Sequence, residues 1–236
     1  MNPIGAFTFV LHSHLPYARM AGRWPHGEEW IHEATAETYI PLLDALYDLH
    51  QDNIPVKLTI GLTPILTEQL ADPDVQDHFD AYVDEKIVAA QEDIARFEKT
   101  NDLHMAYLAR FYTDWYEGIK RSFDERYRRD LVGAFRQLQD EGLIEIVTCA
   151  ATHGYLPLLN RDSSIYGQIK TAVVAHERHF GNPPRAIWLP ECAYRPAYIT
   201  DSGETRPGLE RFLQELDLKL FFTETHTIEG GQPVGV

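Results

Sequence analysis

Five short runs of β-branched, aliphatic and aromatic residues recur along the chain, separated by longer segments in which apolar residues follow a helical period. The runs cover residues 6–11, 56–61, 144–148, 186–189 and 219–223. Runs of this length and composition predict strands, and helical segments between them predict parallel βα units. We therefore expect an α/β fold with a parallel sheet that is covered by helices.

Helical periodicity is clearest in residues 28–48 and 163–180, where Ile165, Ile169, Val173 and His176 follow one stripe. A longer segment, 74–140, separates the second and third predicted strands and carries apolar residues at three- and four-residue steps. This spacing predicts an inserted antiparallel helical hairpin, with its turn near residues 99–102 and solvated, charge-rich outer faces.

Composition and charge narrow the class of protein. The chain has 236 residues, of which 44% are hydrophobic, and 36 acidic against 21 basic residues give a formal net charge of −15. An acidic chain without a long basic cluster is not expected to bind nucleic acid, and it suits a neutral substrate. No apolar run approaches the roughly 20 residues of a membrane span, and the N-terminus lacks the features of a signal peptide. We expect a cytoplasmic protein without membrane contacts, whose Cys149 and Cys192 are free thiols outside any metal-binding spacing.

Polar residues follow each predicted strand. They are His12 and His14 after the first, Thr63 after the second, His153 after the third, Glu191 after the fourth, and Glu224 with His226 after the fifth. The carboxyl ends of parallel strands meet at one edge of a sheet, where active sites are built. Several histidines and carboxylates at that edge favour a functional site over isolated buried histidines.

Glu191 is the foremost candidate for catalysis. The apolar run that ends at Leu189 is followed by Pro190, which cannot donate to a sheet ladder and therefore closes the strand. A carboxylate at this position is placed for chemistry, although a structural role as a helix cap is the alternative.

The residue types favour glycoside transfer. The chain has no serine elbow, phosphate-binding glycine loop or dinucleotide fingerprint, whereas carboxylates beside histidines and aromatic residues suit a reaction that runs on two carboxyl groups. Imidazoles and Arg195 can hydrogen-bond sugar hydroxyls, and apolar faces are offered by Tyr17, Trp24, Trp188 and Tyr194. No cofactor and no metal are expected.

Three motifs resemble glycoside hydrolase family 57 and, within it, the 1,4-α-glucan branching enzymes. The segments His12-Ser13-His14-Leu15-Pro16-Tyr17, Ala151-Thr152-His153-Gly154-Tyr155 and Trp188-Leu189-Pro190-Glu191-Cys192-Ala193-Tyr194-Arg195-Pro196 are similar to the first three motifs of that family. Further matches are Trp24-Pro25, Gly27-Glu28-Glu29 and Thr63-Pro64-Ile65-Leu66, so the resemblance runs from residue 4 to Gly230-Gly231.

The resemblance implies an incomplete (β/α)7 barrel, a retaining mechanism on α-1,4-glucan and Glu191 as the nucleophile. His12, His14 and His153 would bind the donor glucose, with Tyr155 among the substrate contacts. The implied domains are residues 1–190 as the first part of the barrel with the hairpin 74–140 inserted, 191–218 as a small helical domain, and 219–236 as a return strand and loop. Other activities of the family, 4-α-glucanotransferase or α-amylase, are alternatives.

Length is where the chain departs from the family, whose members run to roughly twice its size. The aspartate that serves as general acid belongs to a fourth motif beyond Val236, so we expect an N-terminal part that is inactive alone and needs the missing C-terminal half as partner. Glu224 and His226 are then expected to support the site rather than to supply the acid. Two rival functions are a zinc-dependent hydrolase with His12, His14 and His153 as ligands and an inactive glucan-binding fragment.

Overall fold

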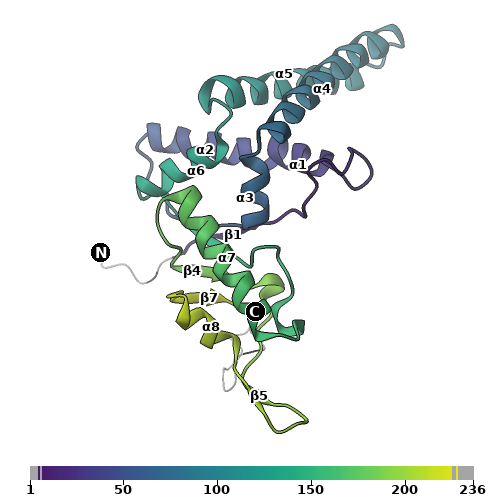
Figure 1. The fold of residues 1–236 in the computed structure, drawn as a ribbon. Helices are drawn as coiled ribbons and strands as arrows, with labels where there is room; N and C mark the ends of the chain where they lie inside the picture. The colour runs from purple at the N-terminus through teal and green to yellow at the C-terminus, as the bar shows by residue number, and fades with distance from the viewer. Residues whose placement is uncertain (1–4, 6, 225–226, 228–236) are drawn as a thin grey trace. The chain divides into compact units, whose positions relative to one another are not determined.

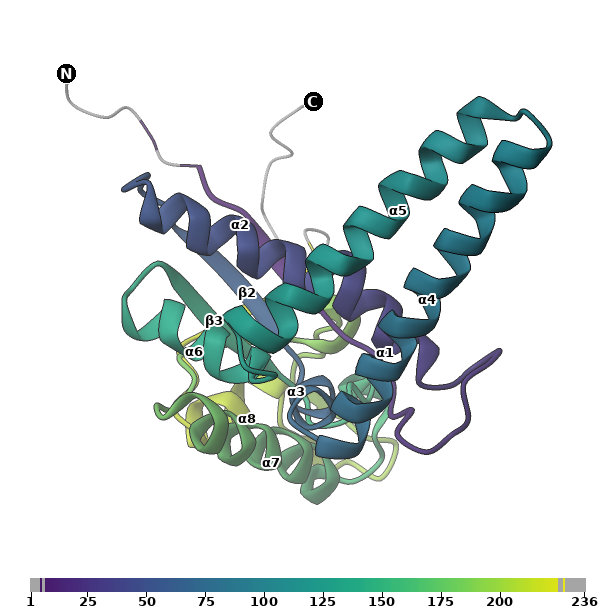
Figure 2. The same cartoon turned by 90° about the horizontal axis from the view of Figure 1, so that it is seen from above.

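The computed structural model describes residues 5, 7–224 and 227 (Figures 1 and 2). The chain divides into two compact units that alternate along the sequence. The sheet unit comprises Met1–Pro16, Lys57–Thr67 and Ile144–Val236, and the helical unit comprises Tyr17–Val56 and Glu68–Leu143.

The sheet unit is built on five parallel strands. In spatial order they are β1 (Val10–Ser13), β2 (Leu58–Leu62), β3 (Ile144–Cys149), β4 (Ala186–Trp188) and β7 (Leu220–Phe222). Each neighbouring pair is parallel. The predicted α/β fold with a parallel sheet is therefore confirmed, and all five predicted strands occur.

The first strand lies further along the chain than the hydrophobic run predicts. The run 6–11 placed His12 after the strand, whereas β1 extends to Ser13 and pairs His12 with Gly61 of β2. Phe7 and Phe9 before it are exposed, at 84% and 58%. The ladder is made by backbone groups, so polar side chains do not end it while the neighbouring strand offers hydrogen-bond partners.

Two helices cover one face of this sheet (Figure 1), namely α7 (Asp162–Phe180) and α8 (Leu209–Glu215). The predicted stripe of α7 is confirmed, because Ile165, Ile169, Val173 and His176 are all buried. A hydrophobic cluster joins residues of both helices to Ile187 of β4. A short antiparallel ladder of β5 (Tyr198–Ile199) and β6 (Thr205–Arg206) lies between β4 and α8 in sequence.

The helical unit contains a run of helix from α1 (Glu29–Ala34) through a π-helical turn (Thr35–Tyr39) into α2 (Ile40–Gln51). Next come α4 (Pro73–Lys99), α5 (Leu103–Arg121), a second π-helical turn (Ser122–Arg126) and α6 (Leu131–Asp140). The helix α3 (Pro64–Leu70) begins in the sheet unit and ends in the helical unit.

The long hairpin consists of α4 and α5, which lie antiparallel and side by side (Figure 2). Asp72 caps the start of α4 by accepting from Asp74 and Val75, and Asp102 caps α5 by accepting from Met105. An aspartate at each N-terminus satisfies backbone N–H groups that the helix leaves unpaired. The domain limits 1–190, 191–218 and 219–236 stay a prediction.

Within the described residues, no helix combines the length and the apolar character that crossing a bilayer requires.

His176 is a buried titratable group in the core of the sheet unit. It is 4% exposed, and its Nδ1 has no hydrogen-bond partner among the described residues. Burial, together with the neighbouring His179, lowers the pKa of His176 to about 4. The folded protein therefore holds this imidazole neutral at pH values where the unfolded chain would protonate it.

We expect the free energy of unfolding to fall as the pH is lowered from about 6.5 towards 4, because only the unfolded chain binds the proton of His176 in that window. The stabilisation that comes from keeping His176 neutral is fully present above the pKa of this histidine in the unfolded chain, about 6.5. His176→Leu should make this pH dependence shallower, as measured by urea unfolding at several pH values. His104→Leu, at an exposed position of α5, is the matched control, and an equal effect of both substitutions would contradict the prediction.

Candidate active site

The alternation of side chains along β1 brings His12 and His14 to the same face of the sheet. His12 lies opposite Gly61, and a Cβ atom at Gly61 would be 3.1 Å from His12 Nδ1. Glycine therefore leaves the space that the imidazole of His12 occupies over β2.

Three imidazoles meet at the ends of β1 and β3. His12 Nε2 lies 3.2 Å from His153 Nε2, and the rings of His14 and His153 stack at 3.9 Å between centroids, 11° from parallel. His14 Nδ1 is 3.3 Å from the hydroxyl of Thr63, a fully buried residue after β2. The structure thus brings together the three histidines that the sequence placed at one sheet edge.

Aromatic rings continue this cluster along the same face. The ring of Trp188 stacks on His12 at 4.8 Å between centroids, and Phe222 of β7 stacks on Trp188 at 5.6 Å. Register explains the arrangement, since Trp188 pairs with Phe222 across β4 and β7. An apolar wall next to polar imidazoles is typical of a site for a small organic ligand.

Glu191 extends from the end of β4 beside this cluster. It lies in the short 3₁₀ turn η4 (Pro190–Cys192), and its carboxylate Oε1 is 3.8 Å from His153 Nδ1. The Glu191 side chain is 72% exposed, so its carboxylate is accessible to a ligand. Its backbone is left-handed, with φ 56° and ψ 25°, a conformation that non-glycine residues rarely adopt.

Hydrogen bonds from neighbouring segments hold the turns that contain Glu191 and His153, both of which have a left-handed backbone. The carbonyl of Cys192 accepts from the Thr223 hydroxyl at 2.9 Å, which fixes the turn of Glu191 to the segment after β7. His153, with φ 56°, follows Thr152, whose backbone N–H donates to Gln168 Oε1 at 3.0 Å. Such conformations persist where surrounding contacts hold them and are common at functional sites.

The imidazoles of the cluster are held neutral. Burial, reinforced by His153 and His14, lowers the pKa of His12 to about 4. Burial and His153 likewise lower the pKa of His14 to about 4. The pKa of His153 is also lowered by burial, although the Glu191 carboxylate opposes the shift. Near neutral pH each ring can therefore both donate and accept a hydrogen bond, as sugar hydroxyls require.

Tyr194 and Arg195, both predicted substrate contacts, are engaged elsewhere. The Tyr194 ring stacks on Phe221 at 5.5 Å and its hydroxyl donates to Glu210 at 2.7 Å. Phe221 points to the opposite face of the sheet from Phe222, so Tyr194 lies on the face that α7 and α8 cover. The Arg195 guanidinium lies 4.9 Å from the Tyr198 ring centroid, and its nitrogens have no hydrogen-bond partner among the described residues. Roles for both in substrate binding stay predictions.

The remaining predicted site residues lie on other segments of the chain. Tyr155 follows the His153 turn and is 45% exposed. Glu224 donates its backbone N–H to the carbonyl of Cys192 at 3.3 Å, which places it next to the Glu191 turn. His226 lies outside the described residues. Tyr17 and Trp24 belong to the helical unit, where they are exposed at 61% and 73%.

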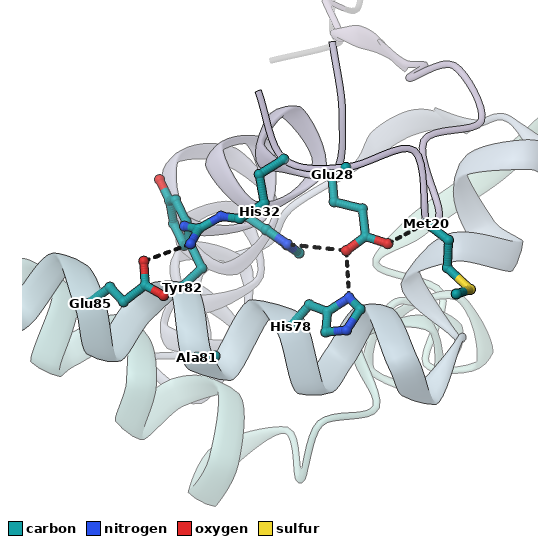
Figure 3. Close-up of a pocket in the computed structure, with 9 residues that line it drawn as sticks. Met20, Glu28, His32, His78, Ala81, Tyr82 and Glu85 are labelled. Atoms are coloured by element: carbon teal, nitrogen blue, oxygen red, sulfur yellow. Dashed lines mark hydrogen bonds and ion pairs between the residues drawn. The ribbon is translucent and has the colours of Figure 1, made fainter. Parts of the chain in front are cut away.

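The loop that carries Tyr17 and Trp24 is anchored within the helical unit beside a pocket of about 410 Å³ (Figure 3). The Glu28 carboxylate, 4% exposed, accepts from the Met20 backbone N–H at 2.6 Å and lies 2.5 Å from His78 Nδ1. It is also 3.8 Å from His32 Nε2. A buried carboxylate with three polar neighbours fixes this loop to α1 and α4.

Sequence reasoning missed several residues that shape the strand-end site. Gly61 makes room for His12, Gln168 of α7 holds the His153 turn, and Phe222 extends the aromatic wall. Cys149 points to the same face, because it pairs in register with Trp188. Alternation within the predicted fifth strand could have indicated Phe222 once the register was known, and Cys149 lies one residue beyond the predicted third strand.

Comparison with known proteins identifies the family. The model of glycosyl hydrolase family 57 matches residues 8–230. The chain belongs to glycosyl hydrolase family 57. The resemblance seen in the three motifs is confirmed, and with it the incomplete (β/α) barrel as the fold.

Branching enzymes are among the most similar proteins of the family. The 1,4-alpha-glucan branching enzyme TK1436 of Thermococcus kodakarensis is 43% identical over 231 residues, which are 96% of this chain and 33% of that protein. Its crystal structure in complex with glucose and additives superposes with a TM-score of 0.83 at 41% identity, over 95% of this chain and 40% of the other. The branching enzyme of Pyrococcus horikoshii gives 0.86 at 43% identity, over 95% and 42%.

An α-amylase is also similar. AmyC of Thermotoga maritima has a TM-score of 0.77 at 32% identity, over 93% of this chain and 40% of the other. This chain thus spans between a third and about two fifths of the length of the relatives that it matches.

The backbone strain at Glu191 predicts a gain in stability when the residue is replaced by glycine. A left-handed non-glycine residue costs about 1–2 kcal/mol, and the exposed carboxylate contributes little packing, so Glu191→Gly should raise the free energy of unfolding by about 1 kcal/mol. Glu191→Ala is the matched control, because it removes the same side chain and keeps the Cβ. Equal unfolding free energies of the two variants, measured in urea, would contradict the prediction.

Proposed function

We propose that this chain supplies the nucleophile and the donor-glucose site of a retaining 1,4-α-glucan branching enzyme. The observation that carries the proposal is the exposed Glu191 carboxylate at the end of β4, with Oε1 3.8 Å from the imidazole of His153. The naming of two close relatives as branching enzymes supports the substrate class, and the structure of one contains glucose.

The proposed reaction runs in two displacements at the anomeric carbon of a donor glucose. In the first, a Glu191 carboxylate oxygen bonds to that carbon while the α-1,4 bond breaks, and the leaving 4-oxygen takes a proton from a general acid. In the second, the 6-hydroxyl of an acceptor glucan attacks the same carbon, gives its proton to that acid's conjugate base and releases Glu191. Two inversions leave an α-1,6 bond with net retention. We place the general acid outside this chain.

The neutral imidazoles suit the donor glucose. His12 and His14 are uncharged near neutral pH, so they can hydrogen-bond hydroxyls of a neutral sugar without a counterion. Trp188 and Phe222 add an apolar wall beside these imidazoles, against which the carbon atoms of a pyranose can pack. Hydrogen bonds to hydroxyls beside the anomeric carbon strengthen as positive charge develops there, which lowers the barrier.

Hydrolysis is the second candidate, because an α-amylase shares this fold at 32% identity. Both activities form the same glucosyl-enzyme on Glu191 and differ in the acceptor, which is water in hydrolysis and a 6-hydroxyl in branching. Product analysis on amylose separates them, since branching creates α-1,6 linkages and hydrolysis creates new reducing ends.

We expect Glu191→Gln to lower branching by roughly 10⁴-fold or more, since an amide cannot form the covalent intermediate. The measurement is α-1,6 linkage formation on amylose by the full-length protein. Folding should be unchanged, because the side chain is 72% exposed.

Glu177→Gln, an equal change at an exposed position of α7, should retain full activity. Glu224→Gln tests the neighbouring carboxylate directly. A Glu191→Gln protein with more than a few per cent of the original activity, or one that is more active than Glu224→Gln, would refute the assignment of the nucleophile.

We further expect the 236-residue chain, assayed alone, to show no branching. Without proton donation to the leaving oxygen, the first displacement loses on the order of 10²–10⁴-fold in rate. The branching enzyme of Thermococcus kodakarensis serves as the positive control in the same iodine-staining assay. Branching by a monodisperse preparation of residues 1–236 would show that the acid lies within the chain, and Glu224 would become the first candidate.

A further inference from the structure

Two histidines and a cysteine converge at the base of the strand-end site. Cys149 is the last residue of β3 and pairs in register with Trp188, whose ring stacks on His12. A ligand atom from each of His12, Cys149 and His153 lies within 4.8 Å of the other two. In the part of the chain that the structure describes, no other group of three histidine, cysteine or acidic residues is placed in this way.

The spacing of the two imidazoles matches that of two ligands on one ion. Zinc–nitrogen bonds of about 2.0–2.1 Å in tetrahedral geometry put two ligand nitrogens about 3.4 Å apart. His12 Nε2 and His153 Nε2 are 3.2 Å apart. Two imidazoles and one thiolate form a borderline-soft ligand set, which suits Zn²⁺ and leaves a fourth position open.

The surroundings of His153 resemble those of a metal-binding histidine. Such residues usually direct their second ring nitrogen to a carboxylate, which orients the ring. His153 Nδ1 faces the Glu191 carboxylate at 3.8 Å. His12 has no equivalent support, because its buried Nδ1 has no hydrogen-bond partner among the described residues. Binding should therefore be reversible and weaker than in a dedicated structural zinc site.

His14 is not suited to join this set. Its ring stacks on His153 at 3.9 Å and 11° from parallel. The lone pairs of an imidazole lie in the plane of its ring, so two nearly parallel stacked rings do not aim nitrogens at one ion. The ligand set therefore differs from the trio His12, His14 and His153 that the sequence offered for a zinc hydrolase.

We propose that His12, Cys149 and His153 form a site for a thiophilic divalent cation such as Zn²⁺, and that the bound ion inhibits the enzyme. On binding, the Cys149 thiol loses its proton to solvent and its sulfur bonds to the ion. The ion then occupies the imidazole nitrogens that donor glucose would use, so inhibition rests on the proposed function. Metal binding itself does not depend on the proposed function. The expectation that the reaction needs no metal is unchanged.

Titration of the 236-residue chain with Co²⁺ tests the site by a signal that is independent of activity. A thiolate ligand gives a sulfur-to-cobalt charge-transfer band in the near ultraviolet, and we expect it to saturate at one ion per chain. Zn²⁺ should displace the cobalt and abolish the band. Cys149→Ala, which keeps a small apolar group in this buried position, should remove the band and weaken Zn²⁺ binding by roughly 10-fold or more.

Cys192→Ala is the matched control, since it removes the chain's other free thiol, and it should keep the band. His14→Ala should also keep it. Circular dichroism shows whether each variant folds, and a Zn²⁺ titration of His12→Ala tests the site without changing a thiol. Absence of the band in the original chain, or its loss in Cys192→Ala but not in Cys149→Ala, would overturn the site.

The inhibitory role is tested separately on the protein as encoded by its gene. Zn²⁺ should inhibit branching, a chelator should reverse the inhibition, and Cys149→Ala should shift the inhibitory concentration upward by roughly 10-fold or more. Stoichiometric binding without inhibition would overturn the inhibitory role while leaving the Glu191→Gln result intact, so failure of this inference and failure of the proposed function are distinguishable.

Discussion

In a parallel sheet every second side chain of a strand points to the same face, and this alternation decides which residues of the three motifs can meet. His12, Trp188 and Phe222 occupy one face and stack in sequence, whereas Ile187 packs with α7 and α8 on the other. A slip of one residue in the pairing of β4 would exchange Trp188 for Ile187 and dismantle the ring stack. The register of five strands is thus the condition on which the imidazole cluster depends.

Left-handed non-glycine residues occur in the turns that follow β3 and β4. His153, Glu191 and Cys192 all have left-handed backbones, and each turn is tied to another segment by Gln168 or Thr223. Ordinary turns would use glycine or asparagine at such positions. The residues found there instead have side chains that can act on a ligand. The hydrogen bonds to Gln168 and Thr223 offset the free-energy cost of the left-handed backbone.

Much of this arrangement follows from the sequence, because β-branched runs with polar ends identify parallel strands and the edge where histidines and Glu191 gather. The limits of β1 do not follow from the sequence, because the neighbouring strand determines how far the hydrogen-bonded ladder extends. Cys149 points to the face of the sheet that carries Trp188, whereas Tyr194 packs on the face that α7 and α8 cover. Both placements depend on strand register and on the turn after β4, which no local sequence pattern specifies. The union of Tyr17–Val56 with Glu68–Leu143 also escapes local reasoning, because long-range contacts such as that between Glu28 and His78 create it.

Both connections that join β1 to β2 and β2 to β3 run through the helical unit. Parallel pairing across long loops is slow, because chain entropy is lost before any ladder forms. The α4–α5 hairpin is built from contacts that are local in sequence and can form early. Ion pairs such as that of Arg126 with Asp44 then link the two segments of the unit. Docking of those segments would shorten the effective loops between β1, β2 and β3, so we expect formation of the helical unit to favour pairing of the strands that carry the active-site candidates.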